Sequence, residues 1–181
     1  GVLTLSNDIT TDNDQTYTAA GGVLLGANVT LTATSSDILF SGTTSTVNST
    51  GSTRTLTVSA NEIEFDGAVG GSSALGALGI TGALDLDAAI TNATSLSVSG
   101  TSNLGADVTT TGTQTYTGAV TLSTNTTITT TDNDVSFGAT IARDGTARNL
   151  TFNTGSGTVS VTGNVGSGAA LGIITLTQTG G

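Results

Sequence analysis

Apolar segments with the character of strands return along this chain every 22 to 25 residues. Leu31 and Leu56 are 25 residues apart, Leu56 and Leu78 are 22 apart, and Leu150 and Ile174 are 24 apart. Gly, Asn, Asp and Ser lie between the segments and supply tight corners. This spacing is typical of one coil in a parallel β-helix, whose coils stack about 4.8 Å apart. We therefore predict a β-solenoid of about seven or eight coils, roughly 35–40 Å long.

Within each segment, apolar and polar residues alternate, as at residues 28–32, 54–58, 62–66 and 158–162. Successive side chains of a strand point to opposite faces, so each segment has one apolar and one polar face. The best helical candidate, residues 83–90, also begins with alternation. The pattern predicts an all-β fold.

A longer duplication lies above this period. Residues 15–18 recur at 114–117, 37–40 at 134–137, 54–58 at 148–152, and 67–76 at 163–172. The four matches keep their order, which indicates a duplicated unit of about 96 residues holding about four coils. We expect one continuous solenoid, an excerpt of a longer chain, with long repeats at residues 1–83 and 84–181.

An antiparallel β-sandwich is the structural alternative, because short strands with turn signals also suit that class. Its hairpins usually need pairs such as Asp-Gly at the turn. Asp66-Gly67 and Asp144-Gly145 are such pairs, but most corners have none. The solenoid is therefore favoured over the sandwich.

Composition excludes several classes of protein. The net charge is −10, Lys is absent, and the only cations are Arg54, Arg143 and Arg148. Such a surface repels nucleic acid and anionic lipid, and no apolar run is long enough to span a membrane. The absence of Cys excludes disulfides and zinc–thiolate sites. Disorder is disfavoured by a positive mean hydropathy and the absence of Pro.

Several motifs together resemble a known family. Residues 114–120, 133–137, 148–151 and 163–172 are similar to the filamentous-haemagglutinin-type repeats of giant bacterial surface proteins. The resemblance covers nearly the whole chain, and residues 84–104 are its least typical stretch. It implies a right-handed parallel β-helix, export to the outer surface of a Gram-negative cell or beyond it, and a role as stalk, adhesin or fibre. It implies no catalytic residues.

No catalytic set can be assembled from the residues, because His, Cys and Lys are all absent. Paired carboxylates remain, since β-helices can host polysaccharide-cleaving enzymes with acids on one face. Glu62, Glu64 and Asp66 are expected on one polar strand face. Their counterparts in the second repeat, residues 158, 160 and 162, are Ser or Thr. A solvated strand face is the favoured interpretation, and we expect no enzyme activity and no cofactor.

Pairs of Asp separated by one residue are the best metal candidates. They are Asp12 with Asp14, Asp132 with Asp134, and Asp85 with Asp87. Calcium takes six to eight oxygen ligands, and one such pair supplies only part of them. Asp also forms turns that satisfy corner backbone groups without an ion. Calcium binding is thus an alternative and not the leading prediction.

Pairs of Thr separated by one residue raise an ice-binding alternative. They occur at Thr30 and Thr32, at Thr115 and Thr117, and at residues 55–57 and 175–177. Ice binding needs such pairs on one face of nearly every coil, whereas here coil length varies and Arg, Asp or Asn interrupts the series. Hydroxyl ladders also form simply because stacked Thr residues pair well across strands.

The leading functional prediction is therefore a structural spacer in a bacterial surface adhesin or extracellular filament. The expected partners are neighbouring coils of the same longer chain, with end-to-end or lateral copies as a further option. The residues do not identify a receptor.

Overall fold

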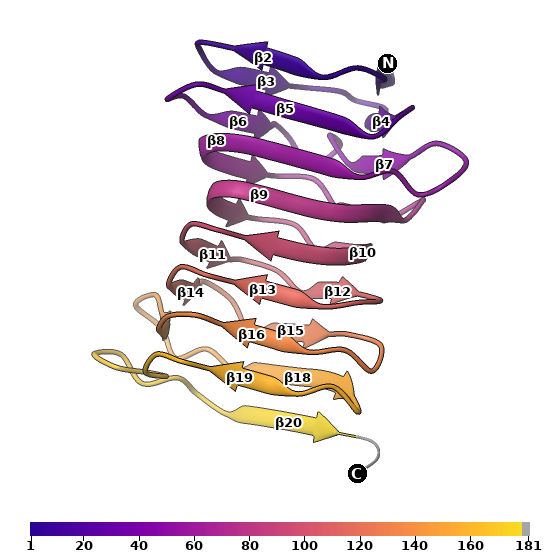
Figure 1. The fold of residues 1–181 in the computed structure, drawn as a ribbon. Helices are drawn as coiled ribbons and strands as arrows, with labels where there is room; N and C mark the ends of the chain where they lie inside the picture. The colour runs from indigo at the N-terminus through magenta and orange to yellow at the C-terminus, as the bar shows by residue number, and fades with distance from the viewer. Residues whose placement is uncertain (179–181) are drawn as a thin grey trace.

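The chain folds into a stack of coils that runs from one terminus to the other. The computed structural model describes residues 1–178, which form twenty β-strands and no helix. The N-terminus lies at one end of the stack and the described C-terminal strand at the other (Figure 1). Each coil passes through three strand positions, so the stacked coils form three parallel sheets, named sheets I, II and III.

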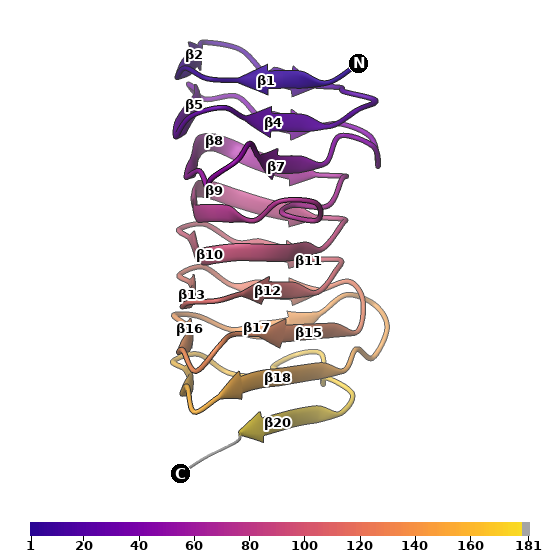
Figure 2. The same ribbon diagram turned by 90° about the vertical axis from the view of Figure 1, so that its right-hand side faces the viewer.

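The strands of each sheet follow one another along the axis, and Figure 2 shows sheet I facing the viewer. Sheet I contains β1 (Leu3–Leu5), β4 (Val23–Leu25), β7 (Val47–Ser49), the start of β10 (Ile90–Val98), β12 (Val108–Thr110), β15 (Thr126–Thr129), β18 (Leu150–Gly155) and β20 (Ile174–Gln178). Sheet II contains β2 (Ile9–Thr11), β5 (Val29–Ala33), parts of β8 (Leu56–Phe65) and β9 (Leu75–Leu86), the end of β10, β13 (Gln114–Tyr116), β16 (Val135–Phe137) and β19 (Val159–Val161). Sheet III contains β3 (Gln15–Tyr17), β6 (Ile38–Phe40), the ends of β8 and β9, β11 (Ser102–Leu104), β14 (Val120–Leu122) and β17 (Ile141–Arg143).

The pairings confirm the predicted fold class. All pairings between strands of residues 1–178 are parallel, and each joins one coil to the next. The described residues complete about eight coils, and β20 begins a ninth. The antiparallel sandwich is therefore excluded. The right-handed sense of the coil stays a prediction from the resemblance.

Coil length varies more than the expected 22 to 25 residues. Leu56 does pair with Leu78, and Leu150 with Ile174, as the sequence indicates. Val29, however, pairs with Leu56 after 27 residues, and Val98 pairs with Tyr116 after only 18. The coils are therefore unequal, although the stack is continuous.

A column of glycines at the corner between sheets II and III accompanies the shortest coils. A Cβ atom on Gly100 would lie 2.2 Å from the carbonyl oxygen of Gly82, and a Cβ on Gly118 would lie 2.3 Å from that of Gly100. The Gly100 N–H also donates to the Gly82 carbonyl at 3.0 Å. Only residues without a side chain permit this approach, so the glycines allow the tight corners of the short coils.

The long repeat is not a whole number of coils. Gln15 lies in sheet III of the first coil, whereas its counterpart Gln114 lies in sheet II of the sixth. The two positions are separated by four complete coils and two further sheets. Strand β9 also passes without interruption through residues 83 and 84, the expected boundary between the repeats. The duplicated segments therefore occupy different sides of the solenoid.

Inward side chains form columns in one continuous apolar core. In sheet III, Tyr17 stacks on Phe40 with ring centroids 5.1 Å apart, and Phe40 stacks on Phe65 at 4.8 Å. The next coils place Leu86, Leu104 and Leu122 at the same position of the column. Aliphatic and aromatic side chains in register thus fill a thin core, although the chain has only six Phe and Tyr residues.

The two copies of the Gln-Thr-Tyr motif make the same buried contacts. The Tyr17 hydroxyl lies 2.6 Å from Gln15 Oε1, and the Tyr116 hydroxyl lies 3.0 Å from Gln114 Oε1. In each copy the Gln amide donates to a carbonyl of the following coil, that of Thr32 at 2.7 Å or Thr129 at 3.0 Å. The motif therefore fits sheet III and sheet II equally, which shows that the sheets are locally interchangeable.

Candidate functional site

The most concentrated set of acids lies on the outer face of sheet III, in the coils formed by β8 and β9. Ile63 and Phe65 point into the core with no exposed surface, and Glu62 and Glu64 alternate with them on the polar side. The pairing of β8 with β9 sets Glu64 opposite Asp85. The structure therefore places Glu62 and Glu64 on one strand face, as expected from the sequence.

Three carboxylates converge within this surface. One carboxylate oxygen from each of Glu64, Asp66 and Asp87 lies within 4.8 Å of the other two, and we name these residues the acidic triad. Asp66 Oδ2 also accepts a hydrogen bond of 2.6 Å from the Gly42 N–H of the preceding coil. Asp87 was not connected with Glu64 and Asp66 in the sequence, because their proximity depends on the register between coils.

Crowding of the carboxylates changes their protonation. Burial raises the pKa of Glu64 to about 7, and the hydrogen bond with Asp66 and the charges of Asp66, Asp85 and Asp87 raise it further. Burial and the charges of Asp85 and Asp66 also raise the pKa of Asp87. Glu64 is therefore partly protonated near neutral pH, and its protonated carboxyl can donate a hydrogen bond within the triad.

We expect the protein to become more stable as the pH falls from about 7.5 to about 5. Between the ordinary pKa of Glu64, 4.5, and its folded value of about 7, the folded state holds a proton that the unfolded state has released. The free energy of unfolding therefore decreases as the pH rises through this window. Solvent screening limits the gain to about 1 kcal/mol, or about 2–4 °C in the melting temperature.

Thermal melts of the wild type and the Glu64→Gln variant at several pH values check this expectation. Gln keeps the shape of the side chain but has no proton to release in this range. The variant should lose most of the pH dependence, and an unchanged slope would show that other groups cause it. Asp144 does not contribute in this window, because the hydrogen bond from Arg148 lowers its pKa to about 2.

The Asp residues proposed from the sequence as metal ligands lie at exposed corners and bind backbone groups of the next coil. Asp14 Oδ1 accepts from the Asp37 N–H at 3.1 Å, and Asp134 Oδ1 accepts from the Thr158 N–H at 2.8 Å. Asp132 Oδ1 accepts from the N–H of Ser156 at 2.9 Å. Asp12 is exposed as well. Calcium binding by these four residues stays a prediction.

Similar contacts recur at other corners, where an Asp or Asn oxygen accepts an N–H of the following coil. These contacts run from Asp8 to Thr30, Asn28 to Thr55, Asp37 to Glu62, Asp107 to Thr127, Asn125 to Asn149, and Asn149 to Ile173. They satisfy backbone donors where the sheet ladders are interrupted by corners. The Asp and Asn residues of the corners therefore hold one coil to the next.

The acidic triad is the group of three possible metal ligands found in residues 1–178, and it includes none of Asp12, Asp14, Asp132 and Asp134. Asp85 is not in the triad either, and its Oδ1 accepts from Asn103 Nδ2 at 2.9 Å. Calcium takes six to eight oxygens. The triad supplies three carboxylates and thus only part of a calcium site.

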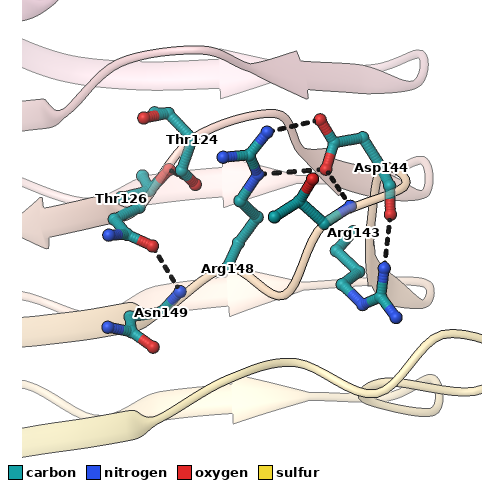
Figure 3. Close-up of polar contacts among 8 residues, drawn as sticks. Thr124, Thr126, Arg143, Asp144, Arg148 and Asn149 are labelled. Atoms are coloured by element: carbon teal, nitrogen blue, oxygen red, sulfur yellow. Dashed lines mark hydrogen bonds and ion pairs between the residues drawn. The ribbon is translucent and has the colours of Figure 1, made fainter.

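Two of the three arginines hold the corner loop at residues 144–149, which Figure 3 shows in close-up. The Arg148 guanidinium donates to both carboxylate oxygens of Asp144, with Nε–Oδ1 at 3.0 Å and Nη2–Oδ2 at 2.7 Å. Arg143 donates from Nε to the Ala170 carbonyl at 2.7 Å and from Nη1 to the Asp144 carbonyl at 2.9 Å. These contacts hold the loop against its neighbours.

The outer face of sheet II carries a continuous series of small residues, mostly hydroxylated, which we name the hydroxyl ladder. It consists of Thr30, Thr57, Gly79, Ser97, Thr115, Ser136 and Ser160, one from each of seven successive coils. Thr32, Ser59 and Thr81 form a second column beside its first coils. The expectation that Arg, Asp or Asn would interrupt this series is wrong for sheet II, because unequal coils keep the hydroxyl positions in register.

Architecture and repetition together define the class of this protein. Parallel strands, stacked coils and a single axial core make it a β-solenoid repeat protein. Within residues 1–178, no helix has the length and apolar character needed to cross a membrane. Comparison with protein-family models, with curated proteins and with solved structures finds no match.

Proposed function

We propose that the chain is a structural spacer, or stalk, in a bacterial cell-surface adhesin or an extracellular filament, and that it has no catalytic role. The observation that carries this proposal is the uninterrupted stack of coils around one core from the first coil to the eighth. Backbone hydrogen bonds of all three sheets run along the axis, so load along the stack is shared by many bonds. The resemblance to filamentous-haemagglutinin-type repeats supports a location at or outside the cell surface.

The use of polar side chains also supports a structural role. The corner Asp and Asn residues accept backbone N–H groups of neighbouring coils, and Arg143 and Arg148 hold a corner loop. The remaining exterior is rich in hydroxyl groups and acids, which keep an extended protein soluble. The conspicuous side chains thus have structural work within the stack.

A chimaeric adhesin tests the spacer. The chain is placed between a bacterial surface anchor and a tip domain of known ligand, and adhesion to that ligand is measured under flow. Adhesion should persist when the acidic triad is neutralised by Glu64→Gln and Asp87→Asn, because neither residue is needed for stacking. It should fall when core stacking is broken by Phe40→Ala. A flexible Gly/Ser linker of the same length is the matched control.

The same chain without the tip distinguishes the other functions. As a spacer, it should bind no cells and cleave no polysaccharide. Cleavage that disappears with Glu62→Gln and Glu64→Gln would overturn the proposal in favour of a carbohydrate-active enzyme. Thermal hysteresis that disappears with Thr115→Lys would overturn it in favour of ice binding by the hydroxyl ladder.

A further inference from the structure

Both ends of the described solenoid expose apolar side chains that are buried in every interior coil. At the C-terminal end, Val165, Ile174 and Leu176 are 42%, 53% and 51% exposed. They border an apolar hollow of about 200 Å³ whose other walls are Ile141, Leu150, Phe152, Val159 and Val161. At the N-terminal end, Val2 and Leu3 are 57% and 37% exposed. The core thus opens to solvent at two faces of similar chemistry.

The strand edges at these ends are also unpaired in the described chain. β19 pairs only with β16, and β20 only with β18. β1, β2 and β3 pair only with β4, β5 and β6 or their continuation in the second coil. Such edges present free N–H and C=O groups that bind another strand. Because every pairing in the stack is parallel, a strand added in the same direction continues the sheet.

We propose that the C-terminal end of one chain binds the N-terminal coil of a second copy, head to tail, as the next coil of the same solenoid. The inference rests on the spacer function, because stacked copies lengthen the stalk. A second copy offers what the open end lacks: parallel edges, apolar residues on the inner side, and polar residues on the outer side.

Charge supports this occupant. The first coil contains Asp8, Asp12 and Asp14, and residues 1–53 contain no Lys or Arg. The last two coils contain Arg143 and Arg148, and no Asp or Glu follows Asp144. Head-to-tail contact therefore brings an acidic end toward a basic one, whereas contact between like ends does not.

β20 determines the rotation between the copies. It already extends sheet I beyond the eighth coil, so β1 of the second copy must pair with β19 in sheet II. β2 then lies beside Val165 in sheet III, and β3 lies beside β20. This register turns the second copy by one sheet, about a third of a turn. The Gln-Thr-Tyr motif already shows that one segment can fit two different sheets with the same contacts.

Single-cysteine variants test the register, because the chain has no Cys of its own. Thr4 and Ser160 are exposed at the centres of β1 and β19. A mixture of Thr4→Cys and Ser160→Cys should form a mixed disulfide under oxidising conditions, because the register places these residues on adjacent strands. Thr4→Cys mixed with Ser136→Cys, one coil further from the end, is the matched control and should not cross-link.

Sedimentation of the 181-residue chain completes the experiment. We expect species that grow with protein concentration, since a head-to-tail contact leaves both ends open. Leu176→Asp should prevent this growth, whereas Thr177→Asp on the outer side of β20 should change it little. A monomer at every concentration, or cross-linking of Ser160→Cys with itself instead of with Thr4→Cys, would overturn the proposal. The spacer function is judged separately, because the chimaeric adhesin contains one copy of the chain.

Discussion

Deletion of residues 90–107 should remove one coil and leave the rest of the solenoid folded. Ile90 pairs with Val108, Leu96 with Gln114, and Leu84 with Ser102, each after 18 residues. Joining residue 89 to residue 108 therefore keeps every inward position inward. The Gln114 amide contacts with Thr110 and Thr129 also stay intact, because they lie outside the deleted segment.

The measurements are far-UV circular dichroism, thermal melting and small-angle scattering. The variant should retain its β spectrum and melt cooperatively, with a rod shorter by about 4.8 Å. Deletion of residues 90–98, half of that coil, is the control. Nine residues cannot pass around three sheets, so this variant should lose both interfaces of the coil and unfold at much lower temperature. Equal stability of the two variants would contradict the coil assignment.

Phe40→Ala should lower the free energy of unfolding by about 3–5 kcal/mol. Phe40 has no exposed surface, and its ring lies between those of Tyr17 and Phe65 at 5.1 and 4.8 Å. Removal of the ring leaves a cavity in a core that is only a few side chains wide and has no larger reservoir of atoms to refill it. Urea unfolding measures the loss.

Phe40→Leu is the matched control. Leu86, Leu104 and Leu122 occupy the same position of the column in later coils. Leu should therefore fill most of the space and lose mainly the aromatic stacking, about 0.5–1.5 kcal/mol beyond the loss of buried area. If Ala and Leu destabilise equally, the column does not depend on filled volume at this coil.

The parallel stack could be predicted from the sequence because its signal is local. Alternation identifies each strand, and equal spacing at Leu56 and Leu78 or Leu150 and Ile174 identifies the coil. The spacing fails where corners shorten. Val98 meets Tyr116 and not a residue 22 to 25 positions later, because the glycine corners make an 18-residue coil possible.

Surface features that depend on several coils could not be predicted in the same way. The acidic triad joins Glu64 to Asp87 of the next coil, and the hydroxyl ladder joins residues 18 to 27 positions apart. An error of one residue in coil length moves a side chain to the opposite face. Prediction of such sites therefore needs the length of every coil, which is set by corner geometry and not by the apolar pattern.

The offset of the duplicated segments by one sheet has a consequence for any array of such units. Matching motifs do not align along one edge of the rod but advance around its circumference. After three units the displacement adds up to whole turns, and a motif faces its original direction again. A partner that binds one motif would therefore meet it from three directions in succession, which distributes attachment points evenly around the shaft.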